Sequence, residues 1–327
     1  MKKLQMGSKN ILGSDLLLSD PPKVFLEQPF NDEKNFEIVY QPRSTHERIV
    51  PRTIHQTWKT EDVPDIWAQS PRDWIEKHPE YLYVLWRDED LKNLISMAYP
   101  WAVETYTNFK YNIQRADFGR MFVLHAYGGV YSDLDLVPKR SITPLIEMFE
   151  NDCTEFEIAL VQGPSGRCGL DLSNFFMFSL QHAPWILSYF CYVINESWNE
   201  LQPWYIRVLS NIKHYYVMTS TGPAAVSAVH NKITEDHGKN SQVMIIPAVF
   251  VNTTKIYEKV DAHAPQDYNL RFSQLQGRSW CDKSTGFAIG AARAWQNRDR
   301  IIFPAFFISL ILFIVFLVLY CKIKARI

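Results

Sequence analysis

Cysteine is scarce in this sequence, and none of the five cysteines stands at the short paired spacing of a zinc site. They are Cys153, Cys168, Cys191, Cys281 and Cys321. We expect these cysteines to be mostly buried thiols. A disulfide between Cys153 and Cys168 is possible only if the domain lies in an oxidising lumen. An excess of charge is also lacking, because 34 lysines and arginines oppose 35 aspartates and glutamates. Without a basic tract, no nucleic-acid partner is expected.

The N-terminal part lacks the apolar core of a cleavable signal peptide, since Leu16–Leu18 is too short a patch. Residues 1–48 are polar and without sustained periodicity, so we expect an extension or linker. Residues 301–321, by contrast, contain no charge. A helix of ~20 residues at ~1.5 Å each crosses the ~30 Å hydrocarbon core of a membrane. We predict a transmembrane helix over 301–321 and a short basic tail over 322–327, with the flanking charges leaving its orientation open.

The region between these two parts has the composition of a folded domain. Of the 327 residues, 47% are hydrophobic, which is ample for a core. Short strand-like runs alternate with longer helix-like stretches, a pattern typical of an α/β domain. The runs are TIHQTW, EYLYVLW, GVYSDLDLV, EIALVQ and VMIIPAVFV. We therefore predict one α/β domain over residues 49–295.

The stretch YGGVYSDLDL, residues 127–136, places two aspartates after a pair of glycines. A helix is predicted to end at Gly128-Gly129, followed by a strand in which Asp133 and Asp135 share one face. Two carboxylates ~5 Å apart repel each other by about 3 kcal/mol at an effective dielectric constant of ~20. Either a retained proton or a divalent cation must offset this repulsion, and Mg²⁺ or Mn²⁺ prefers such oxygen ligands.

Two other interpretations use the same residue types. A second Asp-x-Asp, residues 88–90, opens a helix-like stretch, and we interpret it as a helix cap. The spacing DLDLV also fits a dehalogenase-like phosphatase with Asp133 as its nucleophile. Such an enzyme needs a later acidic pair for Mg²⁺, and neither Asp-Asp nor Gly-Asp-x-x-x-Asp follows in this sequence.

Five ordered blocks of the chain resemble the Asp-x-Asp sugar-binding glycosyltransferase family, family 32. They are VPRTIHQTWKT (50–60), YVLWRDEDL (83–91), RADFGRMFVLHAYGGVYSDLDLVPKRSI (115–142), SNFFMFSLQHAPW (173–185) and STGPAA (220–225). The length and the apolar C-terminal run are most like the branch of inositolphosphoceramide mannosyltransferase catalytic subunits. The resemblance implies a GT-A fold, a nucleotide-sugar donor with GDP-mannose favoured, Mn²⁺ or Mg²⁺, and retention of anomeric configuration.

The resemblance also implies roles for individual residues. Asp133 and Asp135 match the motif for the metal and the diphosphate, and Gln274 stands where the family has a histidine. The expected donor-binding residues are His55, Gln56, Thr57, Arg115, Asp117, Ser279 and Trp280. Asp171 or Asn174 is expected to stabilise the transition state at the anomeric carbon, unless both cap a helix. Arg120 fits a surface ion pair with Asp117 equally well.

The function expected from these features is transfer of mannose to a membrane lipid head group such as inositolphosphoceramide. The alternatives are a hexosyl- or hexosaminyltransferase acting on glycans or glycolipids, and a catalytically silent membrane subunit that binds nucleotide sugar. The absence of the family's two histidines, replaced by Gln274 and Cys281, keeps the silent subunit open. We expect a single-pass protein of the Golgi or endoplasmic reticulum with a lumenal domain, a lipid or glycan acceptor, and a regulatory membrane subunit as partner.

Overall fold

The computed structural model describes residues 10–30, 49–151, 156–163, 172–197, 201, 212–237, 242–247 and 272–274. The chain divides into two compact units, residues 1–211 with 215–279, and residues 212–214 with 280–327. The sheet and its helices lie in the first unit, except for the first two residues of one helix. The predicted span 301–321 lies outside the described residues, and no described helix is both long and apolar enough to cross a membrane.

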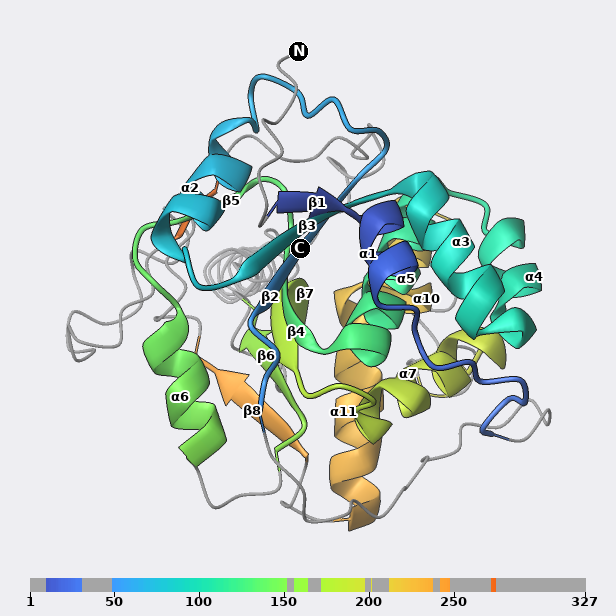
Figure 1. Cartoon of the computed structure of the whole chain (residues 1–327). Coiled ribbons are helices and arrows are strands. Elements are labelled where there is room, and N and C mark those ends of the chain that lie inside the picture. The colour runs from blue at the N-terminus through green and yellow to red at the C-terminus, as the bar shows by residue number, and fades with distance from the viewer. Residues whose placement is uncertain are drawn as a thin grey trace, which may run out of the picture. The chain divides into compact units, whose positions relative to one another are not determined.

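A seven-stranded mixed sheet forms the centre of the first unit, in the order β1-β3-β2-β4-β7-β6-β8 (Figure 1). The strands are β1 Asn10–Leu12, β2 Thr53–Trp58, β3 Leu82–Arg87, β4 Gly129–Ser132, β6 Ile158–Gln162, β7 Leu172–Ser179 and β8 Val243–Ile246. Strands β1, β3, β2 and β4 are parallel, β7 is antiparallel to β4 and β6, and β8 is parallel to β6. A separate antiparallel pair joins β5 Leu136–Pro138 to β9 Phe272–Gln274. The predicted α/β class is confirmed.

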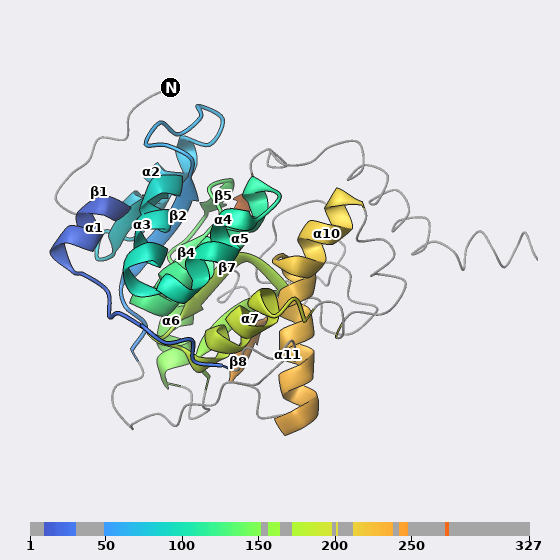
Figure 2. The same cartoon turned by 90° about the vertical axis from the view of Figure 1, so that its right-hand side faces the viewer.

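Helices cover both faces of this sheet (Figures 1 and 2). They are α1 Gly13–Ser19, α2 Gln69–Lys77, α3 Asp88–Ala98, η1 Pro100–Ala102, α4 Val103–Asn108, α5 Asn112–Tyr127, α6 Thr143–Asn151, α7 Pro184–Ile194, α10 Lys213–Ser220 and α11 Pro223–His237. One apolar cluster lies under α1, α3, α5, α7 and α11, and a second lies under α2 and α6.

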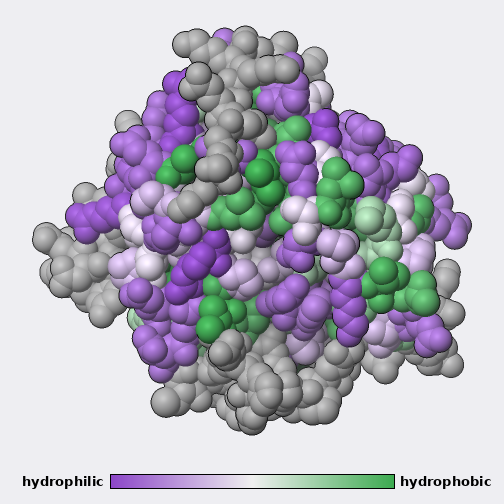
Figure 3. Space-filling view, viewed as in Figure 1, coloured by the Kyte–Doolittle hydropathy of each residue, from purple (hydrophilic) through white to green (hydrophobic). Residues whose placement is uncertain are grey.

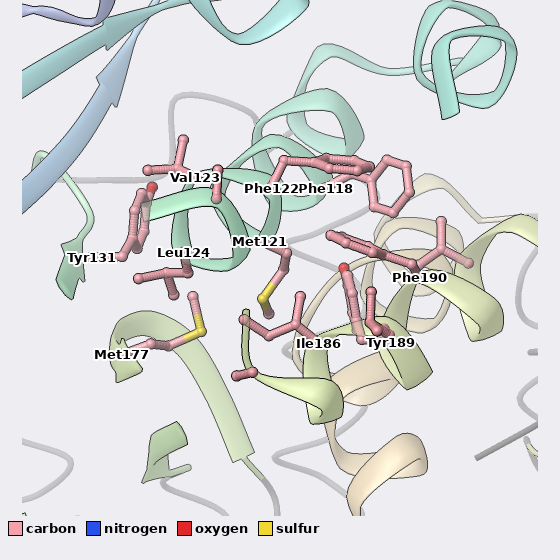
Figure 4. Packing of buried hydrophobic residues seen from close by; sticks show 14 of the residues in the cluster. Phe118, Met121, Phe122, Val123, Leu124, Tyr131, Met177, Ile186, Tyr189 and Phe190 are labelled. Atoms are coloured by element: carbon pink, nitrogen blue, oxygen red, sulfur yellow. The ribbon is translucent and has the colours of Figure 1, made fainter. Parts of the chain in front are cut away.

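Helix α5 runs through the larger apolar cluster. In Figure 4 its residues Phe118 and Phe122 meet Phe190 of α7, and the rings of Phe122 and Phe190 stack with centroids 4.1 Å apart. Every residue of α5 from Asp117 to Tyr127 is buried. A polar side chain in this part of the helix must therefore find a partner inside the protein.

The described N-terminal residues correct the boundary predicted at residue 48. Strand β1 pairs with β3, and α1 follows it directly. Further along, the Phe25 amide donates to the Ala98 carbonyl at the end of α3 (2.7 Å). Residues 10–30 are thus part of the folded unit. Their apolar runs are too short to predict a folded segment from the sequence, but they pack and bond against β3 and α3.

On the face in Figure 3, apolar residues lie as patches among hydrophilic ones.

The helix end predicted at the glycine pair is confirmed, but the strand predicted after it is interrupted. The amide of Gly128, whose φ is 64°, donates to the Leu124 carbonyl (2.8 Å) and closes α5. Strand β4 ends at Ser132, and the Leu136 amide donates to the Asp133 carbonyl (3.1 Å) across a turn. The alternation of side chains in a strand therefore does not apply to Asp133 and Asp135, which lie on this turn.

The order of the strands explains where the turn lies. The chain passes from β2 to β3 on one side and later returns as β4 on the other side of β2. The carboxyl ends of β2 and β4 therefore meet at a topological switch point, where open α/β sheets bind their ligands. Thr57 near the end of β2 and Asp133 just after β4 lie at this edge.

A substitution at Gly129 tests the backbone conformation at the first residue of β4. Its φ is 86°, and a Cβ there would lie 2.6 Å from the Thr53 carbonyl oxygen. We expect Gly129→Ala to lower the free energy of unfolding by about 2–3 kcal/mol. Gly119→Ala in α5 is the matched control, because its Cβ meets only the flexible end of Leu91 and its effect should stay within about 1 kcal/mol. Equal losses in chemical denaturation would contradict the backbone argument.

Candidate active site

The backbone of the turn after β4 is held from behind by side chains of β2 and α2. Gln56 donates through Nε2 to the Asp133 carbonyl (3.1 Å). Ser70 Oγ and Trp74 Nε1 both donate to the Leu136 carbonyl, at 2.6 and 3.1 Å. Both ends of the turn are thereby fixed, while the side chains of Asp133 and Asp135 remain partly exposed.

The carboxylate of Asp133 is oriented by two buried groups. Its Oδ1 accepts a hydrogen bond from the Tyr131 hydroxyl (2.9 Å) and lies 3.0 Å from Arg120 Nη1. Thr57 Oγ1 in turn lies 3.0 Å from the Tyr131 hydroxyl. Partial burial raises the pKa of Asp133, and Arg120 and Tyr131 act against that rise. The side chain is 31% exposed, and Oδ2 carries none of these contacts.

Arg120 is the centre of this network rather than the surface partner that the sequence allowed. Its side chain is only 4% exposed, and its guanidinium lies 4.7 Å from the centroid of the Tyr131 ring. Nη2 lies 3.1 Å from Asp117 Oδ1, and Nη1 donates to the Asn174 carbonyl (2.7 Å) as well as to Asp133. Burial alone would lower the pKa of Arg120, but Asp133, Tyr131 and Asp117 raise it, so the guanidinium stays charged.

Asp117 is held on both oxygens. Oδ1 accepts from Asn174 Nδ2 (3.0 Å) and from Arg120, and Oδ2 accepts from Thr221 Oγ1 (3.4 Å). Burial, together with the nearby Asp133 carboxylate, raises the pKa of Asp117 to about 7, although Arg120, Asn174 and Thr221 act against the rise. Asn174, predicted to act at the anomeric carbon, lies buried in β7 with its amide directed to Asp117.

Arg115 and Asp117, which are predicted to act together on the donor, lie on different faces of α5. Residues i and i+2 of an α-helix diverge by ~200°, so the two side chains point to different faces. Arg115 donates to the Phe109 carbonyl (2.7 Å) and to Asn112 near the start of α5. Only Asp117 joins the network around Asp133.

Two of the three residues predicted from the block IHQTW are structural in this arrangement. His55 is fully buried, its Nδ1 accepts from Trp86 Nε1 (3.1 Å), and its Nε2 lies 3.1 Å from the Gly128 carbonyl. Burial lowers the pKa of His55 to about 3, so the ring is neutral. Gln56 is buried behind the turn, and Thr57 alone extends the network toward the sheet edge.

The remaining predicted residues differ in how far the structure describes them. The backbone of Gln274 pairs opposite Leu136, the residue after Asp135, so β9 lies beside the turn. Asp171, Ser279 and Trp280 lie outside the described residues, as does Cys281. Among the described residues no group of three or more His, Cys, Asp or Glu gathers as a metal site.

The oxygens on the turn fit a hard divalent cation. The side chains of Asp133 and Asp135 come from one fixed turn and are partly exposed. Mg²⁺ and Mn²⁺ take carboxylate oxygens and complete their coordination with water and substrate phosphates. Two carboxylates are therefore enough for a cation shared with a diphosphate, although too few for a closed structural site.

Sequence reasoning missed the buried roles of Tyr131, Ser70 and Trp74 and underrated Arg120. The spacing of Asp117 and Arg120, three residues apart on a helix, was a usable signal because such residues are neighbours. Ser70 and Trp74 carry no such signal, since their contacts with the turn link residues more than 60 positions apart.

Comparison with known proteins defines the class first. The family described as "Glycosyltransferase sugar-binding region containing DXD motif" matches residues 64–152, which include Asp117, Arg120 and the turn with both aspartates. Among solved structures, the PaToxG glycosyltransferase aligns with a TM-score of 0.40 at 15% identity, over 58% of this chain and 73% of that one. The matched region is thus similar to the sugar-binding region of glycosyltransferases.

Two fungal relatives then narrow the class. Inositol phosphoceramide mannosyltransferase 3 of Schizosaccharomyces pombe is 30% identical over 283 residues, which cover 85% of this chain and 68% of that protein. Mannosyl phosphorylinositol ceramide synthase CSH1 of Saccharomyces cerevisiae is 31% identical, over 71% of this chain and 53% of that protein. The chain belongs to the DXD-containing glycosyltransferase family, in the group formed by these inositol phosphoceramide mannosyltransferases.

Arg120→Met tests the buried ion network. Removing the guanidinium that Asp117 and Asp133 share leaves both carboxylates poorly solvated and without its charge. The free energy of unfolding should therefore fall by about 3–5 kcal/mol. Arg52→Met is the control, because the pair of Arg52 and Glu150 is more exposed, at 32% and 15%, and should contribute about 1 kcal/mol or less.

The pH dependence of the same variant gives a second measurement. Without Arg120 the pKa values of Asp117 and Asp133 rise in the folded state, so the folded variant takes up protons that the unfolded chain does not. Its stability deficit should therefore shrink as the pH is lowered from about 8 to about 5. A deficit that stays constant over this range would show that the loss comes from packing.

Proposed function

We propose that this chain is a retaining mannosyltransferase that moves mannose from GDP-mannose to the head group of inositolphosphoceramide. The observation that carries the proposal is the similarity to the Schizosaccharomyces pombe inositol phosphoceramide mannosyltransferase, which extends across 85% of this chain. The chain has the DXD turn directly after β4, at the carboxyl edge of the sheet. The switch point between β2 and β4 supports a nucleotide-sugar-binding fold of the GT-A type.

In this proposal Asp135 and Asp133 hold the divalent cation, with Mn²⁺ favoured over Mg²⁺. When bound, the cation neutralises negative charge that develops on the departing diphosphate, so that no acid catalyst is needed there. Tyr131 and Arg120 hold Asp133 Oδ1, which keeps Oδ2 outside these contacts and favours the ionised carboxylate. Thr57 stands at the same edge, and its hydroxyl bonds to that of Tyr131.

The acceptor and the cell compartment are further parts of the proposal. The charge-free residues 301–321 support a single membrane span, which would hold the domain near a lipid head group. We place the protein in the Golgi or endoplasmic reticulum with a lumenal domain. Its acceptor is then a lipid in the same membrane.

Asp135→Asn tests the assignment of the cation. The full chain in membranes should transfer mannose from GDP-mannose to inositolphosphoceramide in Mn²⁺ buffer, and the variant should lose at least about 100-fold of this rate. Asp236→Asn is the matched control, an aspartate of α11 that is 40% exposed and bonds to Lys232. Its rate should equal that of the wild type.

The same assay separates the rival functions. Transfer from UDP-galactose or another UDP-hexose, with none from GDP-mannose, would replace the proposal by a glycan or glycolipid transferase. Donor binding in calorimetry without transfer or hydrolysis would identify a silent subunit. Full activity of Asp135→Asn would refute the role of the turn in either enzyme.

A further inference from the structure

The corner between α10 and α11, residues 219–222, is anchored to the helices behind the candidate active site. Gln114 Nε2 of α5 donates to Ser220 Oγ (2.8 Å), and the Tyr192 hydroxyl of α7 donates to the Thr219 carbonyl (2.7 Å). The Tyr189 hydroxyl donates to the Thr221 carbonyl. Three side chains from two helices thus hold one short corner.

Within this corner, Thr221 faces the ion network. It is fully buried, and its hydroxyl donates to Asp117 Oδ2, whose other oxygen already bonds to Asn174 and Arg120. A carboxylate that is hydrogen-bonded through one oxygen can still rotate about its Cβ–Cγ bond. Hydrogen bonds to both oxygens restrain that rotation. Within the described residues, Thr221 is the partner that completes this restraint on Oδ2.

The restraint reaches the turn through consecutive contacts. Asp117 Oδ1 lies 3.1 Å from Arg120 Nη2, and Arg120 Nη1 lies 3.0 Å from Asp133 Oδ1. All members of this series except Asp133 are almost completely buried, so water does not replace a lost contact easily. A shift of Asp117 therefore moves the guanidinium that orients Asp133.

We propose that Thr221 is a positioning residue for the DXD turn: its hydroxyl fixes Asp117, and through Arg120 it sets the orientation of Asp133 toward a divalent cation and its diphosphate ligand. The inference rests on the proposed function, since it assumes that Asp133 contacts this complex. Thr221 itself is too deeply buried to touch the substrate. Its effect on binding must therefore pass through Asp117 and Arg120.

The experiment compares Thr221→Val, which keeps the shape and removes the hydroxyl, with Thr221→Ser, which keeps the hydroxyl. Thr219→Val is the matched control, because Thr219 is also buried but its hydroxyl bonds to the Tyr215 carbonyl (2.8 Å) of its own helix. The full chain is titrated with Mn²⁺ in the presence of GDP, and free Mn²⁺ is followed by electron paramagnetic resonance. The melting temperature of each variant is recorded alongside.

We expect Thr221→Val to weaken Mn²⁺ binding about 3- to 10-fold, less than the ~10–100-fold typical of groups that bond a metal ligand directly. Thr221→Ser should bind within about twofold of the wild type, and Thr219→Val should bind like the wild type even if its melting temperature falls. Unchanged binding by Thr221→Val, or equal weakening by Thr219→Val, would overturn the inference alone. If the wild type binds no Mn²⁺ in the presence of GDP, the proposed function fails and the inference fails with it.

Discussion

One buried guanidinium determines the arrangement of the candidate active site. Arg120 lies between Asp117 and Asp133 and against the ring of Tyr131. One guanidinium group therefore forms ion pairs with two carboxylates from different elements. Helix α5 supplies both Arg120 and Asp117, while Asp133 comes from the turn after β4. Because the helix is buried on nearly all sides, the guanidinium cannot leave this position for solvent without breaking the larger apolar cluster.

This interaction gives the two carboxylate oxygens of Asp133 different roles. Oδ1 is committed to Arg120 and Tyr131, whereas Oδ2 takes no part in these contacts, and the side chains of Asp133 and Asp135 are both partly exposed. Gln56, Ser70 and Trp74 fix the backbone of the turn in advance, which lowers the entropy lost when a ligand binds. A site of this kind is preorganised for charge on a diphosphate, and the proposed mannosyl transfer depends on that property.

Much of this could be predicted from the sequence, and the limits have physical causes. The strand β2, the end of α5 at Gly128 and the cap of α3 follow from local patterns, and Asp90 does accept from the Arg87 amide (2.9 Å) as a cap. The sequence wrongly predicts strand at Asp133, because Leu134 and Leu136 continue the apolar alternation. The burial of His55 and Arg120 depends on contacts between distant elements, which local periodicity does not contain.

The most direct test of the account is a crystal structure of the protein with Mn²⁺ and GDP, using anomalous scattering to locate the metal. The account predicts a manganese peak next to Asp133 and Asp135, with Asp133 still bonded to Arg120 and Tyr131. A manganese peak elsewhere, or an Asp133 carboxylate released from Arg120 and turned away from the nucleotide, would contradict the claim that the buried guanidinium presents this residue to the ligand.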